Sequence, residues 1–168
     1  MGEMLTGQLF HGSVHNLVRV TWSAFETAAP DLASAVASRY SSHPHHVLAT
    51  LMRDGSPRTS GINVMIDEGT MWFGSMPGAR KIADLERDPR VSVHSAPLDE
   101  HLTDGDARVD GVVHILDPTK VARWRPGTPP GDFFEIRISR VHLVTVVSER
   151  LVITMWSPDQ GLRIVERS

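Results

Sequence analysis

The sequence contains no cysteine, no long apolar run and no excess of positive charge. Without cysteine the chain has no disulfide framework, no cysteine-ligated zinc site and no thiol nucleophile. No apolar run approaches the roughly 18 residues that indicate a membrane-spanning helix. A formal net charge of −3 argues against a dedicated nucleic-acid binder, which usually presents a basic face. We therefore expect neither a membrane nor a nucleic acid as a partner.

Several functional motifs are missing as well. The chain has no Gly-x-Ser-x-Gly elbow, no glycine-rich dinucleotide fingerprint and no Walker phosphate loop. The first residues lack the basic and then apolar layout of a signal peptide, so we expect a cytoplasmic protein. The length of 168 residues predicts one domain. Residues 1–20 show little periodicity and are expected to form an N-terminal arm, followed by a single domain over residues 21–168.

Two short helices are expected near the start of the chain. Ser23 and Glu26 have the spacing of a capping box, which indicates a helix over residues 21–29. Pro30 ends that helix and is expected to occupy the first position of the next one. An apolar stripe then continues to Tyr40, and we expect both helices to cover a sheet.

The remainder of the chain has the pattern of short strands separated by turns. Asp54-Gly55 is typical of a hairpin turn, so residues 58–66 are expected to form one returning strand. A second tight turn at Asp67-Glu68-Gly69 leads into the next strand. Six to eight mostly antiparallel strands with short flanking helices predict a mainly β, α+β fold. A barrel is favoured because closure removes exposed sheet edges.

The stretch from Thr70 to Val93 carries its charges in an unusual order. A helix is expected to start at Arg80 and Lys81, which places two cations at its positive end. Asp84 and other acidic residues lie toward its negative end, where cations are normally favoured. A bound anion would resolve this conflict, because a Ser hydroxyl, free backbone N–H groups and two cations together form a phosphate cradle. The alternative is an ordinary surface helix in which Arg80 pairs with Asp84.

This stretch resembles a known family. A strand ends in Ser75, three residues and a small residue precede Arg80-Lys81, and the helix leads into Asp-Pro-Arg-Val-Ser at residues 88–92. The order resembles the pyridoxamine 5′-phosphate oxidase-like superfamily, the flavin-binding split β-barrels. The resemblance implies a split β-barrel that forms a homodimer, with the cofactor between subunits. It implies cofactor-binding roles for Ser60, Gly61, Ile62, Asn63, Gly74, Ser75, Met76, Ala79, Arg80 and Lys81.

Departures from the family pattern bear on the cofactor. True pyridoxamine phosphate oxidases carry an Arg where this chain has Ser60 and a Lys where it has Met65. They also have a C-terminal Arg/His-containing segment that this chain lacks, so we expect a different substrate. With fewer cations, the resemblance implies either weaker FMN binding or the deazaflavin F420, whose single phosphodiester and long acidic tail need a different distribution of charge. We take F420 as the expected cofactor and FMN as the alternative.

The function implied by the resemblance is hydride transfer between the cofactor ring and a small conjugated substrate, with no catalytic side chain and no metal. The alternative is a non-catalytic split barrel that binds flavin, deazaflavin or haem. Trp124, Trp156 and the loop 125–132 are candidates for lining the wall of the second subunit.

Histidine and aromatic residues leave further alternatives open. His45 and His46 are adjacent on a strand and should point to opposite faces, which disfavours a shared metal ion. His94 and His114 fit either a substrate or haem contact or a structural role. Trp72 and Phe73 could stack on a ring or belong to the core.

Overall fold

The computed structural model describes residues 17–96 and 105–167, so most of the expected arm and most of the polar stretch before Gly105 lie outside the described residues. Four helices and nine strands occur in the described part of the chain. No helix in it is long and apolar enough to cross a membrane. The elements are α1 (Trp22–Ala28), α2 (Pro30–Ser41), β1 (His46–Leu51), β2 (Pro57–Ile62), β3 (Val64–Asp67), β4 (Thr70–Ser75), α3 (Arg80–Arg87), β5 (Arg90–His94), β6 (Asp106–Ile115), α4 (Pro118–Trp124), β7 (Asp132–Val147), β8 (Arg150–Ser157) and β9 (Gly161–Arg167).

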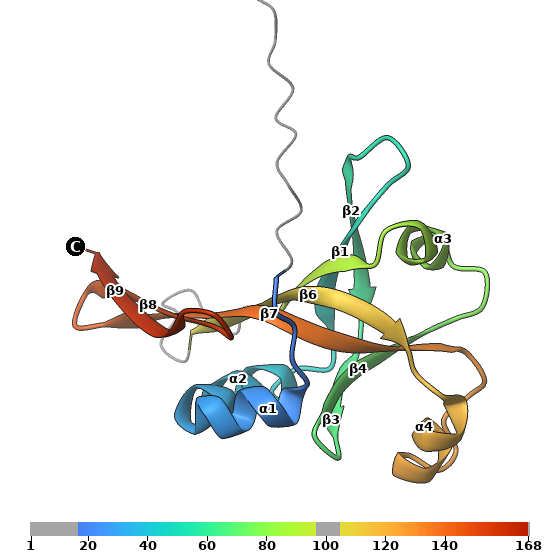
Figure 1. Cartoon of the computed structure of the whole chain (residues 1–168), viewed down its shortest axis with the longest axis horizontal. Coiled ribbons are helices and arrows are strands. Elements are labelled where there is room, and N and C mark those ends of the chain that lie inside the picture. The colour runs from blue at the N-terminus through green and yellow to red at the C-terminus, as the bar shows by residue number, and fades with distance from the viewer. Residues whose placement is uncertain (1–16, 97–104, 168) are drawn as a thin grey trace, which may run out of the picture.

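The strands form one coiled sheet in the order β2-β1-β5-β6-β7-β4-β3 (Figure 1). Every strand pair is antiparallel, which confirms the expected mainly β fold with short helices. The long strand β7 pairs with β4 through its first residues and with β8 through its last. β8 and β9 thereby extend from the barrel as a two-stranded ribbon (Figure 1).

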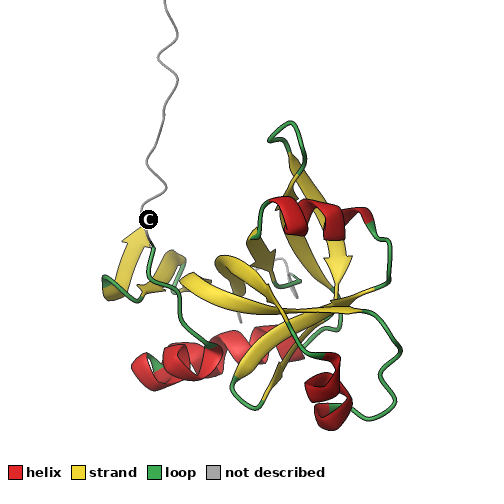
Figure 2. Cartoon of the chain, turned by 45° about the vertical axis from the view of Figure 1, so that its right-hand side comes forward, coloured by secondary structure: helices red, strands yellow, loops and turns green. Residues whose placement is uncertain are grey.

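The helices lie on different sides of this sheet. α1 and α2 lie together on one side, whereas α3 lies beside β1 and β2 and α4 follows the end of β6 (Figure 2). The main core fills the space between the first two helices and the sheet. Its largest fully buried side chains include Trp22, Phe25, Leu48, Phe73 and Ile136. A second, smaller cluster around Trp72 and Phe133 lies away from these helices.

Local chemistry explains most element boundaries, with one correction. Thr21 caps α1, since its hydroxyl accepts a hydrogen bond from the N–H of Ala24 at 3.2 Å. The expected capping box of Ser23 and Glu26 is therefore wrong by two positions. Pro30 is the first residue of α2, as expected. The Asp54-Gly55 turn joins β1 and β2, and Gly55 has a φ of +84°.

The expected single strand over residues 58–66 is divided in two at Asn63. On one side of the break β2 pairs with β1, where Ile62 lies opposite His46. On the other side β3 pairs with β4, where Val64 lies opposite Phe73. No hydrogen-bonded pair joins β2 and β3, which are the two end strands of the described sheet. Among the described strands the sheet is therefore open between β2 and β3, as expected of a split barrel, and the chain passes across the opening at Asn63.

His46 holds the chain at this break. Its imidazole is 2 % exposed, with Nε2 at 3.0 Å from the carbonyl oxygen of Tyr40. Nδ1 accepts a hydrogen bond from the N–H of Val64 at 3.1 Å. The first N–H of β3 is thus satisfied by a side chain, which replaces the strand partner lost at Asn63. His45 is exposed, so the two adjacent histidines do point to opposite faces.

α3 is attached to the barrel through Asp84. This carboxylate is 4 % exposed and accepts hydrogen bonds from the Thr50 hydroxyl at 3.0 Å and from Arg58 Nε at 2.6 Å. The hydrogen bond from Arg58 is the main cause that lowers the pKa of Asp84. Asp88 pairs with Arg90 at 2.6 Å instead of lying free at the end of the helix. The alternative pairing of Arg80 with Asp84 is therefore not formed.

The role of His46 can be tested by the pH dependence of stability. Burial lowers the pKa of His46 from its ordinary value of 6.5. The unfolded chain therefore binds a proton more readily, and stability should fall as the pH drops below about 6.5. We expect His46→Gln to be less stable than wild type at pH 7.5 by about 1–3 kcal/mol, because Val64 loses its acceptor. The variant should also show a weaker fall in stability toward pH 5.5.

Urea denaturation at pH 7.5, 6.5 and 5.5 measures both effects. The matched control is His114→Gln, which changes an exposed histidine on β6 and should retain wild-type stability and pH dependence. A His46→Gln variant with the same fall in stability as wild type would contradict the assignment.

Candidate functional site

The turn after β4 leaves the first turn of α3 available to a ligand. Ser75 ends the strand, and Gly78 has a φ of +75° in the turn that follows. Ala79 precedes the helix and provides no side-chain cap, and the first turn contains no acidic residue. The N–H of Ile82 donates to the carbonyl oxygen of Ala79 at 2.9 Å, so within the described residues the N–H groups of Arg80 and Lys81 are those left without an intrahelical acceptor. The Ser75 hydroxyl is buried, and its bond to the Met76 carbonyl oxygen is long, at 3.4 Å.

The two cations of this turn are placed differently. Lys81 is half-buried and extends toward β2, where its Nζ lies 3.4 Å from the carbonyl oxygen of Gly61. Burial lowers the pKa of Lys81, because the ammonium group has left part of its water shell. Arg80 is exposed and forms no hydrogen bond or ion pair within the described part of the chain. Asp84 of α3 neutralises neither cation, because its carboxylate is bound to Thr50 and Arg58.

A cavity of about 330 Å³ opens beside Lys81. Seven of the ten residues expected to bind the cofactor line it, namely Gly61, Ile62, Asn63, Gly74, Ser75, Met76 and Lys81. Ser60, Ala79 and Arg80 do not line it. Four further residues complete the wall: Met65, Trp72, Thr128 and Phe133. Of these, Trp72 was expected as a possible ring contact, and Thr128 lies in the loop that was expected to line the wall of the second subunit. The structure therefore brings together the β2 end, the β4 end and the start of α3, as the resemblance implied.

The split in the barrel explains why residues 61–63 face this cavity. β2 pairs only with β1 and β3 only with β4, so the chain between them has one strand edge without a partner. A side chain built on Gly61 would meet no atom within 4 Å. The space in front of this glycine is therefore open, and a planar group can approach the backbone closely.

Aromatic side chains form another part of the wall. Trp72 is fully buried, and its ring contacts Phe133 edge to face with the centroids 5.9 Å apart. Trp124 lies beyond it, with the two indole centroids 6.3 Å apart. Trp72 thus belongs both to the small core cluster and to the cavity, so its two alternative roles do not exclude each other. Phe73 lies in the main core and stacks on Phe134.

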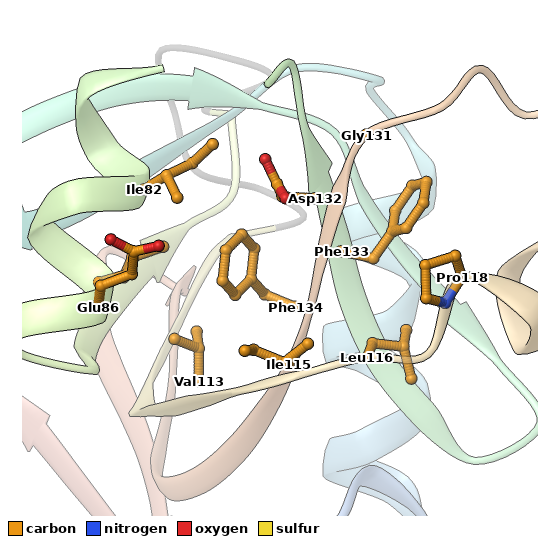
Figure 3. A pocket seen from close by; sticks show the side chains of 11 residues that line it. Ile82, Glu86, Val113, Ile115, Leu116, Pro118, Gly131, Asp132, Phe133 and Phe134 are labelled. Carbon is orange, nitrogen blue, oxygen red and sulfur yellow. The ribbon is translucent and has the colours of Figure 1, made fainter. Parts of the chain in front are cut away.

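A second cavity of about 290 Å³ lies between α3 and the strands β6 and β7 (Figure 3). It shares Phe133 with the first cavity, but its wall is mainly aliphatic and aromatic. Its charged groups are the carboxylates of Glu86 and Asp132, and no cation lines it. Negative charge in an apolar wall repels a phosphate. The cavity beside Lys81 is therefore the better anion site.

Other residues singled out in the sequence lie elsewhere. His94 and His114 line neither cavity. Trp156 is 5 % exposed and packs against Phe25 in the main core, with the ring centroids 4.8 Å apart. Within the loop 125–132, Thr128 faces the cavity of its own chain. Gly131 lies so close to β4 that a side chain built there would come 2.7 Å from the carbonyl oxygen of Ser75.

Comparisons with known proteins agree with the fold. The family model described as pyridoxamine 5′-phosphate oxidase matches residues 32–145. This match includes the β2–β3 break, the turn before α3 and the first part of β7. None of the curated proteins compared with the chain matches it.

Three solved structures have a similar fold. PhzG from Burkholderia lata, in complex with tetrahydrophenazine-1-carboxylic acid, is 12% identical with a TM-score of 0.64, and the match covers 88% of this chain and 93% of that one. A pyridoxamine 5′-phosphate oxidase-related, FMN-binding protein from Nostoc punctiforme is 13% identical with a TM-score of 0.60, covering 83% and 96%.

A protein of unknown function from Agrobacterium tumefaciens is 22% identical with a TM-score of 0.53, covering 66% of this chain. This chain spans only 54% of the length of that protein. At these identities the likeness shows the fold alone, whereas the family model covers more than half of the sequence. The chain therefore belongs to the pyridoxamine 5′-phosphate oxidase family of split β-barrels.

Proposed function

We propose that this protein is an oxidoreductase that binds a flavin-type cofactor, F420 or alternatively FMN, in the cavity beside Lys81. The observation that carries the proposal is the half-buried Lys81 ammonium beside the buried Ser75 hydroxyl and the uncapped start of α3. An ammonium group loses hydration energy on burial, and a bound phosphate compensates for this loss. The family and the FMN-binding protein from Nostoc punctiforme support a flavin-type ring.

The proposed site divides into a phosphate end and a ring end. Ser75, Lys81 and the backbone of the first helical turn would bind the phosphate, with Arg80 adding charge from outside the cavity. The backbone of residues 61–63 and the ring of Trp72 would hold the flat ring system. The bound cofactor would supply hydride transfer to or from a small conjugated substrate, and the protein would orient both partners and exclude water.

The charge of the phosphate end supports F420 over FMN. Within the described part of the chain, Lys81 is the one cation that lines the cavity. Arg58, which lies earlier on β2, is held by Asp84 and is not available to the ligand. A terminal phosphate such as that of FMN carries nearly two negative charges near pH 7, whereas a phosphodiester carries one. A site with one lining cation matches the smaller charge.

The same lining favours a second candidate function. Among residues 17–96 and 105–167, no carboxylate and no imidazole lines the cavity, so this part of the chain offers no obvious general acid or base there. This observation favours a non-catalytic protein that stores or carries the cofactor. Haem is the least supported ligand, because no histidine lines the cavity.

A second copy of the chain is expected to complete the site, because the resemblance implies a homodimer. Met76, which lines the cavity, is 81% exposed in the single chain, and Ile115 beside the second cavity is 86% exposed. Large exposed apolar side chains next to a ligand cavity support a surface that is covered in the assembled protein.

The double variant Arg80→Ala, Lys81→Ala tests the phosphate end. We expect FMN and F420 binding to be lost, because both cations are removed. The melting temperature of the apoprotein should stay the same or rise, since these cations oppose the helix dipole. Absorption and fluorescence titrations of wild type and variant measure the affinity, with Arg53→Ala as a control for an exposed cation in the β1–β2 turn. Retained cofactor affinity in a folded double variant would contradict the site.

Turnover separates the two candidate functions. Reduced cofactor is added to wild type together with a panel of small conjugated substrates, and oxidation of the cofactor is followed by its spectrum. Substrate-dependent oxidation supports the oxidoreductase, whereas tight binding without turnover favours the storage role.

Gly61→Val tests the ring end. The new side chain enters open space in front of β2, so it should block the ring without a clash inside the protein. A β-branched residue also suits a strand, and we expect unchanged or slightly higher stability. Affinity for FMN and F420 should fall by about a hundredfold or more. The control Thr59→Val introduces the same side chain at an exposed position of β2 and should bind normally. Normal binding by Gly61→Val would place the ring elsewhere.

A further inference from the structure

Asp67 connects two separate parts of the cavity wall. Its Oδ2 accepts a hydrogen bond from Nε1 of Trp72 at 2.9 Å and another from Nε of Arg125 at 2.8 Å. Its Oδ1 accepts a third from Nη2 of Arg125 at 3.1 Å. Trp72 lies on β4, whereas Arg125 follows α4 at the start of the loop that contains Thr128. One carboxylate therefore holds the buried indole and the loop at the same time.

The loop is held at both of its ends. At one end Arg125 is paired with Asp67, and its carbonyl oxygen accepts hydrogen bonds from the N–H of Thr128 at 3.2 Å and from the Thr128 hydroxyl at 2.7 Å. At the other end Gly131 lies against the carbonyl oxygen of Ser75. Thr128, between these two points, faces the cavity. Arg125 is also held by its backbone, whose N–H donates to the carbonyl oxygen of Val121 at 2.8 Å, and the pairing with Asp67 adds the side-chain contact that ties the loop to β3.

The ion pair is not needed to hold the whole fold together. The Arg125 side chain is 49% exposed, and pairs with such exposure contribute little to folding stability. Arg125 does not line the cavity, and its guanidinium group is already bound to a carboxylate. It is therefore unsuited to bind the phosphate. Any effect of Arg125 on ligand binding must therefore act through Asp67 and through the loop that contains Thr128.

We propose that Asp67 and Arg125 are positioning residues that fix the shape of the ring end of the cavity. Asp67 orients the indole of Trp72, and Arg125 holds the loop so that Thr128 meets the ligand. This inference rests on the proposed function, because it assumes that a flat ring occupies the cavity. In this proposal Asp67 and Arg125 affect how well the ring of the cofactor fits the cavity, and they do not contribute to binding of the phosphate.

The variant Arg125→Met tests this pair, because it keeps a long side chain and removes the fork of N–H donors. We expect affinity for FMN and F420 to fall by about tenfold. The absorption spectrum of bound cofactor should move toward that of free cofactor. The salt dependence of binding should remain that of wild type, since the phosphate cations are intact. Arg125→Lys should recover part of the affinity, and Arg123→Met is the control for an exposed cation in the last turn of α4.

A readout without cofactor keeps this test separate from that of the proposed function. Hydrogen exchange of the amides of Gly127, Thr128 and Gly131 in the apoprotein should be faster in Arg125→Met than in wild type, with a melting temperature within about 2 °C. Unchanged exchange, or unchanged affinity and spectrum, would overturn the positioning role. Failure of wild type to bind FMN and F420 would instead overturn the proposed function.

Discussion

The change of strand partner at Asn63 is the constraint on which the rest of this structure depends. Before this residue the chain pairs with β1, and after it the chain pairs with β4. Both ends of the sheet therefore meet in consecutive residues without being hydrogen-bonded to each other. His46 makes this arrangement possible, because its buried imidazole accepts a hydrogen bond from the N–H of Val64, which has no partner on a neighbouring strand.

The opening that results has walls from parts of the chain that are distant in sequence. Two carboxylates hold these walls in place. Asp84 binds Thr50 and Arg58 and so fixes α3 against β1 and β2. Asp67 binds Trp72 and Arg125 and so fixes the indole and the loop after α4. Because Asp84 is occupied in this way, it does not pair with the cations at the start of α3, which remain available to an external anion.

The sequence allowed the positions of most elements to be predicted, because local signals mark them. Pro30, the Asp54-Gly55 turn and the turn before Arg80 lie where they were expected. The break at Asn63 was missed, because Ile62 and Val64 continue a regular alternation with no glycine or proline at the break itself. The helix cap at Thr21 was missed because a neighbouring pair imitates a capping box.

Part of the candidate site was also predictable. The charge order around Arg80 and Lys81 indicated an anion, and the family resemblance supplied the residues of β2 and β4. Asp67 and Arg125 are 58 residues apart in the sequence, and hydrophobic periodicity does not predict a contact over such a distance. The position of Thr128 in the wall was not predictable for the same reason. The sequence also gives no sign that Asp84 turns inward. The buried contacts of Asp84 explain why an acidic residue is tolerated toward the end of α3. The proposed phosphate would explain why two cations are tolerated at its start.

The most direct measurement is a crystal structure of the protein grown with FMN or F420. The account predicts density for the phosphate at the start of α3, within hydrogen-bond distance of the Ser75 hydroxyl and the Lys81 ammonium group. It also predicts density for the ring along residues 61–63 and beside Trp72. A ligand bound instead between α3 and β6, beside Glu86 and Asp132, with the turn before α3 free of phosphate, would contradict it.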